Sequence, residues 1–245
     1  MNISFKKILI TFVTILITFL VFEIISTVYF IQKSGQLVKQ SESYEKILES
    51  PEKRMLVVGD STGVGTGVRS IENSTAGRLS KKYPNSTVEN YSVNGLRLKG
   101  LLEILEPLSD NKYNLILIQV GANDIIKLTT RENIEKRITE VLNITNRMSD
   151  NIIFLHSGDV GESTVIPSFA RPIFSWRSKI MRDIYLEKDK EFENAHYVDL
   201  LKAKEVIDIK DNVEKYNAED NFHLNDLGYG IWFEVIEKEI DLLNI

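Results

Sequence analysis

The feature that most constrains the fold is an alternation of short apolar or β-branched runs with longer helical patterns, from residue 55 to the C-terminus. Near-continuous apolar strands that alternate with helices indicate a parallel sheet covered by helices on both faces. The sequence therefore predicts an α/β fold, a three-layer α/β/α sandwich around a parallel, flavodoxin-like five-stranded sheet. The expected strands are 55–58, 87–93, 115–120, 151–156 and 196–200.

Helical patterns fill the intervals between these strands. A capping box from Thr129 to Glu132 predicts the start of one helix. In parallel α/β sheets, ligands bind at the carboxyl ends of the strands, so the loops there are the expected location of a functional site. The expected helices are 75–83, 98–108, 131–148, 174–193 and 227–243.

The N-terminal segment has a different character. Lys6 and Lys7 precede an apolar span, residues 8–31, in which Glu23 is the only charged residue. Twenty-four residues form a helix of roughly 36 Å, enough to cross a hydrocarbon core of about 30 Å. The sequence predicts a transmembrane helix. A cleaved signal peptide with its apolar core at 8–22 is the alternative, but no small-x-small pair follows at a suitable place.

The chain is accordingly expected to have three parts. Residues 1–31 are a cytoplasmic tip and transmembrane anchor, 32–53 are a polar stalk, and 54–245 are the folded domain. Because the lysines precede the span, the positive-inside tendency keeps the N-terminus in the cytoplasm. The prediction is a single-pass membrane protein with its domain outside the cytoplasm; cleavage of the span would instead give a secreted protein.

Composition excludes several classes of function. The net charge is −5, and lysine and arginine are spread among the acids, so no nucleic-acid partner is expected. The chain has no cysteine, which excludes disulfides, thiolate–metal sites and cysteine nucleophiles. A phosphate-binding P-loop is not expected either, because no lysine lies between Arg54 and Arg69 in the glycine-rich loop. No cofactor is predicted.

The glycine-rich loop contains Ser61, which could act as a nucleophile. A serine nucleophile needs a histidine base, a carboxylate that orients it, and donors for the oxyanion. His156 and His196 lie at the ends of expected strands and are interpreted as structural. His223 lies in a polar loop three residues after Asp220, close enough for the carboxylate to hold one ring nitrogen. Such a pair could also bind a metal, but without a further histidine cluster no metal site is predicted.

Four short blocks occur along the chain in this order: Gly59-Asp60-Ser61, Gly95, Gly121-x-Asn123-Asp124 and Asp220-x-x-His223. Together they resemble the signature of the SGNH, or GDSL, hydrolase family. The resemblance covers residue 55 to the C-terminus. Two departures are small: Leu224 stands where many members have proline, and Ala122 where some have a second glycine.

The resemblance implies a role for each of five residues. Ser61 would be the nucleophile, His223 the general base and Asp220 the residue that orients it. The backbone N–H groups of Ser61 and Gly95 and the side chain of Asn123 would form the oxyanion hole. Asp60 and Asp124 have no direct role in attack, and capping or positioning of the loops is expected for both.

The implied activity is that of a serine esterase or acylhydrolase that works through an acyl-enzyme. Expected substrates are ester-bearing small molecules, O-acyl groups on envelope glycans, or lipid esters, and the membrane is a partner through the N-terminal helix. Two alternatives stay open: an O-acyltransferase, and a non-catalytic module that binds glycan or lipid. The loop also satisfies G-x-S-x-G, the nucleophile elbow of α/β-hydrolases, but several strands normally precede that elbow.

The long segment 158–179 bears on the substrate. It contains Phe169, Phe174 and Trp176, and it could overhang the site as an acyl or leaving-group pocket. The alternative is that these aromatic side chains are ordinary core under a loop.

Overall fold

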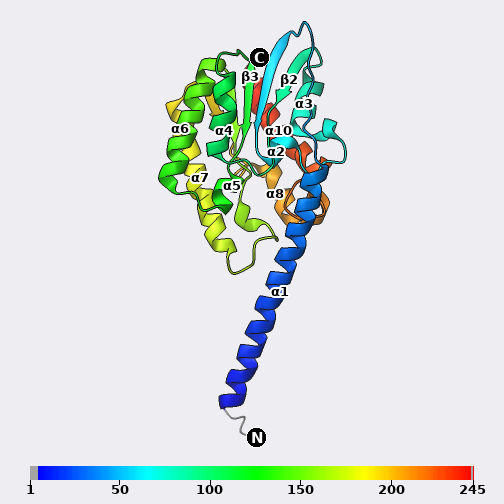
Figure 1. The fold of residues 1–245 in the computed structure, drawn as a ribbon, viewed down its shortest axis with the longest axis vertical. Helices are drawn as coiled ribbons and strands as arrows, with labels where there is room; N and C mark the ends of the chain where they lie inside the picture. Colours follow the sequence, from blue (N-terminus) through cyan, green and yellow to red (C-terminus); the bar gives the residue numbers. More distant parts are fainter. Residues whose placement is uncertain (1–4, 244) are drawn as a thin grey trace.

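Five parallel strands form the central sheet in the computed structural model, which describes residues 5–243 and 245 (Figure 1). The strand order is β2-β1-β3-β4-β5. The predicted fold class is confirmed, and each strand lies within three residues of its predicted bounds. The strands are β1 (Lys53–Gly59), β2 (Ser86–Asn90), β3 (Leu115–Gln119), β4 (Ile152–Leu155) and β5 (Ala195–Tyr197).

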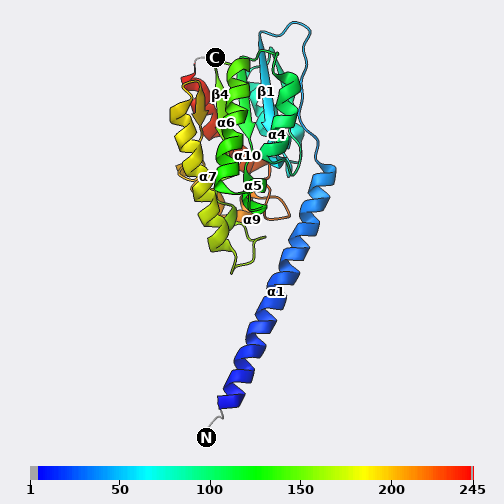
Figure 2. The same ribbon diagram turned by 60° about the vertical axis from the view of Figure 1, so that its left-hand side comes forward.

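Helices cover both faces of the sheet (Figures 1 and 2). Successive side chains of a strand point to opposite faces, so each strand contributes to both hydrophobic cores. In β3, Ile116 and Ile118 face one core, and Leu115 and Leu117 face the other. The first core is covered by α4 (Leu98–Leu105), α6 (Arg131–Met148) and α7 (Arg171–Glu191). The second is covered by α3 (Thr75–Lys82), α8 (Lys204–Asp211), α9 (Val213–Tyr216) and α10 (Asp226–Leu242).

Local capping explains where two helices begin. The hydroxyl of Thr130 accepts a hydrogen bond from the backbone N–H of Asn133 over 3.3 Å and caps α6. The predicted capping box from Thr129 is wrong, because the Thr129 hydroxyl donates to Asp124 Oδ1 instead. Helix α7 begins three residues before its predicted start, with Pro172 in its first turn, where the missing N–H costs no intrahelical bond.

The N-terminal helix α1 (Phe5–Gln40) is continuous and extends away from the sheet (Figures 1 and 2). By length and composition it is a candidate membrane span, with a mean hydropathy of 2.8 in its most apolar window, although a signal sequence would meet the same criteria. Residues 1–4 of the predicted cytoplasmic tip lie outside the described residues. Helix α1 runs nine residues into the predicted stalk, and Lys46 then pairs with Val88 at the edge of the sheet. The division of the chain at residues 31 and 53 stays a prediction.

Candidate active site

The loop after β1 presents Ser61 as the first residue of the short helix α2 (Ser61–Val64). Asp60 caps this helix, because its Oδ1 accepts hydrogen bonds from the N–H of Thr62 at 3.0 Å and from its hydroxyl at 2.9 Å. The Tyr229 hydroxyl, fully buried in α10, donates to the carbonyl oxygens of Ser61 and Thr66 over 3.4 and 3.1 Å. Tyr229 thus holds the backbone of Ser61, and Asp60 holds that of the next residue, Thr62. The predicted capping role of Asp60 is confirmed.

Ser61, His223 and Asp220 lie in a hydrogen-bonded row. His223 Nε2 is 3.0 Å from Ser61 Oγ, and His223 Nδ1 is 2.6 Å from Asp220 Oδ2. The other carboxylate oxygen, Asp220 Oδ1, accepts from the backbone N–H groups of Phe222 and His223. Since a carboxylate can only accept, Nδ1 carries the proton and Nε2 is left to accept from the serine hydroxyl.

The environment of Asp220 keeps its carboxylate ionised. Burial acts to raise the pKa of Asp220, but the hydrogen bond and charge of His223 and the two backbone donors outweigh it, so the pKa lies below its usual value. Both Asp220 and His223 are buried. The carboxylate can therefore orient the imidazole ring and stabilise the imidazolium that forms when the ring takes a proton.

The two other predicted residues of the oxyanion hole lie on the turns after β2 and β3, the two strands that flank β1. Gly95 has a positive φ of 77°, in the left-handed region that favours glycine. Asn123 lies in the first turn of α5 (Ala122–Ile126), and its side chain has no hydrogen bond within the described residues. The residue before it, Gly121, has a φ of 141°, which favours glycine, and a Cβ there would also lie 2.4 Å from Met181 Sδ.

Asp124 is a structural residue, as predicted. Its fully buried carboxylate accepts from the Leu98 N–H at 2.8 Å and from the Thr129 hydroxyl at 2.9 Å. It therefore ties the start of α4 to the end of the α5 turn. This linkage fixes the loop that carries Asn123.

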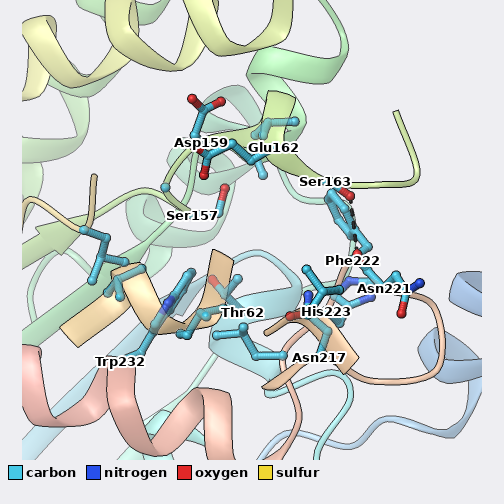
Figure 3. Close-up of a pocket in the computed structure, with 18 of the residues that line it drawn as sticks. Thr62, Ser157, Asp159, Glu162, Ser163, Asn217, Asn221, Phe222, His223 and Trp232 are labelled. Atoms are coloured by element: carbon cyan, nitrogen blue, oxygen red, sulfur yellow. Dashed lines mark hydrogen bonds between the residues drawn. The ribbon is translucent and has the colours of Figure 1, made fainter. Parts of the chain in front are cut away.

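A cavity of about 120 Å³ adjoins Ser61 and His223 (Figure 3). Figure 3 shows Ser157, Asp159 and Ser163 on one side and His223 and Trp232 on the other. The apolar part of its lining was not predicted from the sequence, although the spacing of Val206, Ile209 and Val213 is typical of an amphipathic helix. The apolar lining residues are Ala122, Val160, Leu200, Val206, Ile209, Val213, Phe222, Leu224 and Trp232.

The segment 158–179 is divided in its role. Its first part lines the cavity, from Gly158 to Ser163. Phe174 is half-buried and packs against the core beneath α7. Phe169 and Trp176, however, are each 61% exposed and line neither the cavity nor the core.

The other two histidines lie away from Ser61. His156 is fully enclosed between Tyr185 and Tyr197, and burial lowers its pKa to about 4. His196 is half-buried on β5, with Nδ1 3.6 Å from Glu239. Both are part of the packing of the sheet. In the part of the chain that the structure describes, no group of three or more His, Asp or Glu side chains is arranged to hold a metal ion.

The comparison with protein families decides the class. The GDSL-like lipase/acylhydrolase family matches residues 57–231, which include all four blocks. The chain belongs to this family. This GDSL hydrolase is thus an SGNH-type serine hydrolase that acts on ester bonds. Among curated proteins, no sequence match was found.

Solved structures share the fold of this GDSL hydrolase at low sequence identity. A lipolytic G-D-S-L family protein from Veillonella parvula is 14% identical, with a TM-score of 0.62 over 76% of this chain and 96% of its own. The psychrotrophic esterase EstA from Pseudoalteromonas sp. is 17% identical, with a TM-score of 0.61 over 79% and 100%. The acetylxylan esterase Axe2 from Geobacillus stearothermophilus is 18% identical, with a TM-score of 0.55 over 79% and 96%.

Proposed function

We propose that the protein is a serine esterase whose catalytic triad is Ser61, His223 and Asp220. The observation that carries the proposal is the unbroken row of hydrogen bonds from Asp220 Oδ2 through the His223 ring to Ser61 Oγ. Serine is a weak nucleophile until a base takes its proton. In this row the base, the group that orients it and the serine are all within hydrogen-bonding distance.

The reaction has two halves. Ser61 Oγ attacks the ester carbonyl carbon while His223 Nε2 takes the hydroxyl proton; the C–O bond to the alcohol then breaks, and Nε2–H protonates the leaving oxygen. The acyl group remains on Ser61. A water molecule then gives a proton to His223 Nε2 while its oxygen attacks the acyl carbon. The bond from that carbon to Ser61 Oγ breaks, Nε2–H returns the proton to Oγ, and the acid is released. Asp220 stays ionised throughout.

The oxyanion that forms in each half would accept hydrogen bonds from the N–H groups of Ser61 and Gly95 and from Asn123 Nδ2. Ser61 N–H belongs to the first turn of α2, where backbone donors have no partner within the helix. The Asn123 amide is free of other hydrogen bonds within the described residues. Each such donor is worth roughly 3 kcal/mol of transition-state stabilisation.

We propose O-acyl groups on envelope glycans, or ester lipids, as the substrate classes. The apolar side of the cavity beside Ser61 suits the acyl part of an ester. Two proteins of similar fold are an esterase and an acetylxylan esterase. A cavity of about 120 Å³ is small, which favours a short acyl group over a long chain held entirely within the protein.

We also propose that α1 stays in the membrane as an uncleaved anchor, with Lys6 and Lys7 on the cytoplasmic side and the catalytic domain on the other. The length and apolar character of α1 support this arrangement. The packing of its C-terminal half on the domain also supports it, because Lys33 forms an ion pair with Glu219 at 3.0 Å.

The test of the catalytic proposal is labelling with a fluorophosphonate probe, followed by assays on p-nitrophenyl esters from acetyl to long acyl chains. We expect Ser61 to be the labelled residue and the Ser61→Ala variant to stay unlabelled. Absence of labelling in the folded wild type would favour the non-catalytic module. Transfer of the acyl group to an added alcohol, at the expense of hydrolysis, would favour the acyltransferase.

A further inference from the structure

Helix α1 contacts the domain along only part of its length. Its side chains from Phe5 to Phe22 are all exposed, whereas from Glu23 onward one face is half-buried against the domain. These positions recur three and four residues apart, as on one face of a helix. They are residues 23, 26, 27, 30, 33, 34, 37 and 38.

The first of these contacts lie inside the apolar span. Glu23 Oε2 accepts a hydrogen bond from the Ser168 N–H over 2.8 Å, and the Thr27 hydroxyl donates to the Val165 carbonyl over 3.3 Å. The loop before α7 therefore lies against apolar-span residues of α1. Figures 1 and 2 show this loop, in yellow-green, as the part of the domain that reaches furthest along α1 toward the N-terminus.

The length of the uncovered apolar segment is too short for a bilayer. Residues 8–22 rise about 22 Å as a helix, against a hydrocarbon core of about 30 Å. The remaining 8 Å or so corresponds to about five more residues, which extends the core to about Thr27. A chain anchored at Lys7 thus brings Glu23, Thr27 and the loop packed on them to the membrane boundary. The Ser168 N–H meets the one carboxylate of the span, which would otherwise be costly there.

The surface beside this loop is apolar. Phe169, Ile173 and Trp176 are 61%, 56% and 61% exposed. Ile173 and Trp176 are three residues apart and share one side of the start of α7, and Phe169 lies on the turn just before the helix. Leu128, 57% exposed, is on the neighbouring turn, which the Arg177 guanidinium holds by donating to the carbonyls of Ile125 and Thr129. We call Leu128, Phe169, Ile173 and Trp176 the apolar patch.

We infer that the apolar patch is embedded in the membrane interface on the domain's side of α1, so that the esterase site opens at the bilayer surface and takes esters that reside in it. The inference rests on the proposed membrane span and deepens the proposed function. Aromatic side chains are favoured at the interface, and apolar faces there are buried about 5–10 Å deep. The loop also joins the patch to the site, because Ser163 lines the cavity and its hydroxyl donates to the Asn221 carbonyl.

The position of Trp176 can be measured directly, because the chain has only two tryptophans and Trp232 is buried in the domain. The full chain is incorporated into vesicles of phosphatidylcholine and phosphatidylglycerol in which the phosphatidylcholine is brominated on its acyl chains. We expect bromine to quench the emission of the wild type but not that of Trp176→Phe, in which Trp232 is the reporter. Vesicles brominated near the glycerol should quench more strongly than those brominated near the chain ends.

The outcomes separate the two proposals. If the chain floats with the vesicles and Trp176 is not quenched, the anchor stands and the apolar patch is not embedded. If the chain does not float with the vesicles, the membrane span is wrong and the inference falls with it. Hydrolysis of p-nitrophenyl acetate, measured in the same samples, reports the esterase activity independently of either result.

The consequence for substrate is tested with Phe169→Ser combined with Trp176→Ser. We expect kcat/KM on a long-chain ester dissolved in the vesicles to fall about tenfold, with turnover of soluble p-nitrophenyl acetate unchanged. Leu242→Ser is the matched control, since Leu242 is 71% exposed and is the last residue of α10, three residues before the C-terminus. Figure 1 marks the C-terminus at the end of the domain opposite the loop before α7. Equal activity of the double variant and the control on the vesicle ester would overturn the inference.

Discussion

Asp220 forms two hydrogen bonds with His223. Its Oδ2 is 2.6 Å from the ring nitrogen Nδ1, and its Oδ1 accepts from the backbone N–H of His223 over 3.0 Å. This double contact fixes both the position and the tautomer of the proposed base. The same carboxylate also stabilises the turn from Asp220 to His223, because Oδ1 accepts from the backbone N–H groups of Phe222 and His223.

The Asp220→Asn variant should therefore keep the turn but lose the His223 tautomer that carries its proton on Nδ1. The amide oxygen can still accept from the backbone, but its NH₂ group faces Nδ1 and moves the ring proton to Nε2, which then cannot accept from Ser61. We expect kcat for p-nitrophenyl acetate to fall roughly 10³- to 10⁴-fold. Glu219→Gln, the exposed neighbour paired with Lys33, is the control and should change kcat by less than about twofold. Comparable losses in both variants would contradict the role of Asp220.

Ser61→Ala should abolish ester hydrolysis without unfolding the domain. The hydroxyl has its hydrogen bond with His223, and the backbone of the residue is held by Tyr229. We expect kcat to fall by at least about 10³-fold, with the melting temperature within about 2 °C of wild type. Assays with several ester chain lengths and a thermal melt provide the measurement. Near wild-type turnover would exclude Ser61 as the nucleophile.

Substitutions of the adjacent residues Asn123 and Asp124 should have different effects, one on catalysis and the other on stability. Asn123→Ala removes a proposed oxyanion donor, so kcat should fall about 10²- to 10³-fold while the melting temperature is kept. Asp124→Ala leaves the buried Leu98 N–H without its acceptor and should cost about 1–3 kcal/mol of unfolding free energy. Kinetics and denaturant unfolding of the two variants check the contrast. A loss of stability alone in Asn123→Ala would remove it from the oxyanion hole.

Stability should depend on pH through His156. Burial lowers its pKa from 6.5 to about 4. Between these pH values His156 therefore binds a proton in the unfolded chain but not in the folded chain. The free energy of unfolding should fall as pH falls through this range, by roughly 3 kcal/mol in total, with no further loss from this group below it. We expect His156→Phe to flatten this slope and the half-buried His196→Gln to leave it in place. Urea unfolding at several pH values gives the measurement; an unchanged slope in His156→Phe would be inconsistent with this origin.

A chain that begins at Ser41 should fold and act on small esters. It loses the contacts of α1 but keeps three contacts that hold the segment after α1 to the domain, from Ser41 to Asn94, Tyr44 to Ser80 and Lys46 to Val88. The full chain should fractionate with membranes and resist carbonate extraction, since α1 is long enough to span them. External protease should reach the domain but not a cytoplasmic marker. A mature protein that lacks the first thirty or so residues would instead identify a cleaved signal peptide.

Much of the fold could be predicted because its signals are local. The run 115–120 gave β3 almost to the residue, since an apolar stretch of that length fits a strand buried on both faces. Capping chemistry was less predictable. Thr129 and Thr130 both have side chains that can cap a helix. The Thr129 hydroxyl donates to the buried carboxylate of Asp124, and the Thr130 hydroxyl caps α6. Such competition depends on what the fold brings near each hydroxyl.

The sequence by itself determined the strand and helix alternation, the apolar N-terminal helix and the five residues expected in the site, because periodicity, length and motif order are carried by the chain alone. Only the tertiary structure decided that Ser61 and His223, 162 residues apart, lie 3.0 Å from each other, since their loops meet only when the parallel strands align their carboxyl ends. It also decided that α1 lies against the loop before α7. That contact depends on which side of the largely apolar span carries hydrogen-bonding groups, and Glu23 and Thr27, opposite Ser168 and Val165, lie on that side.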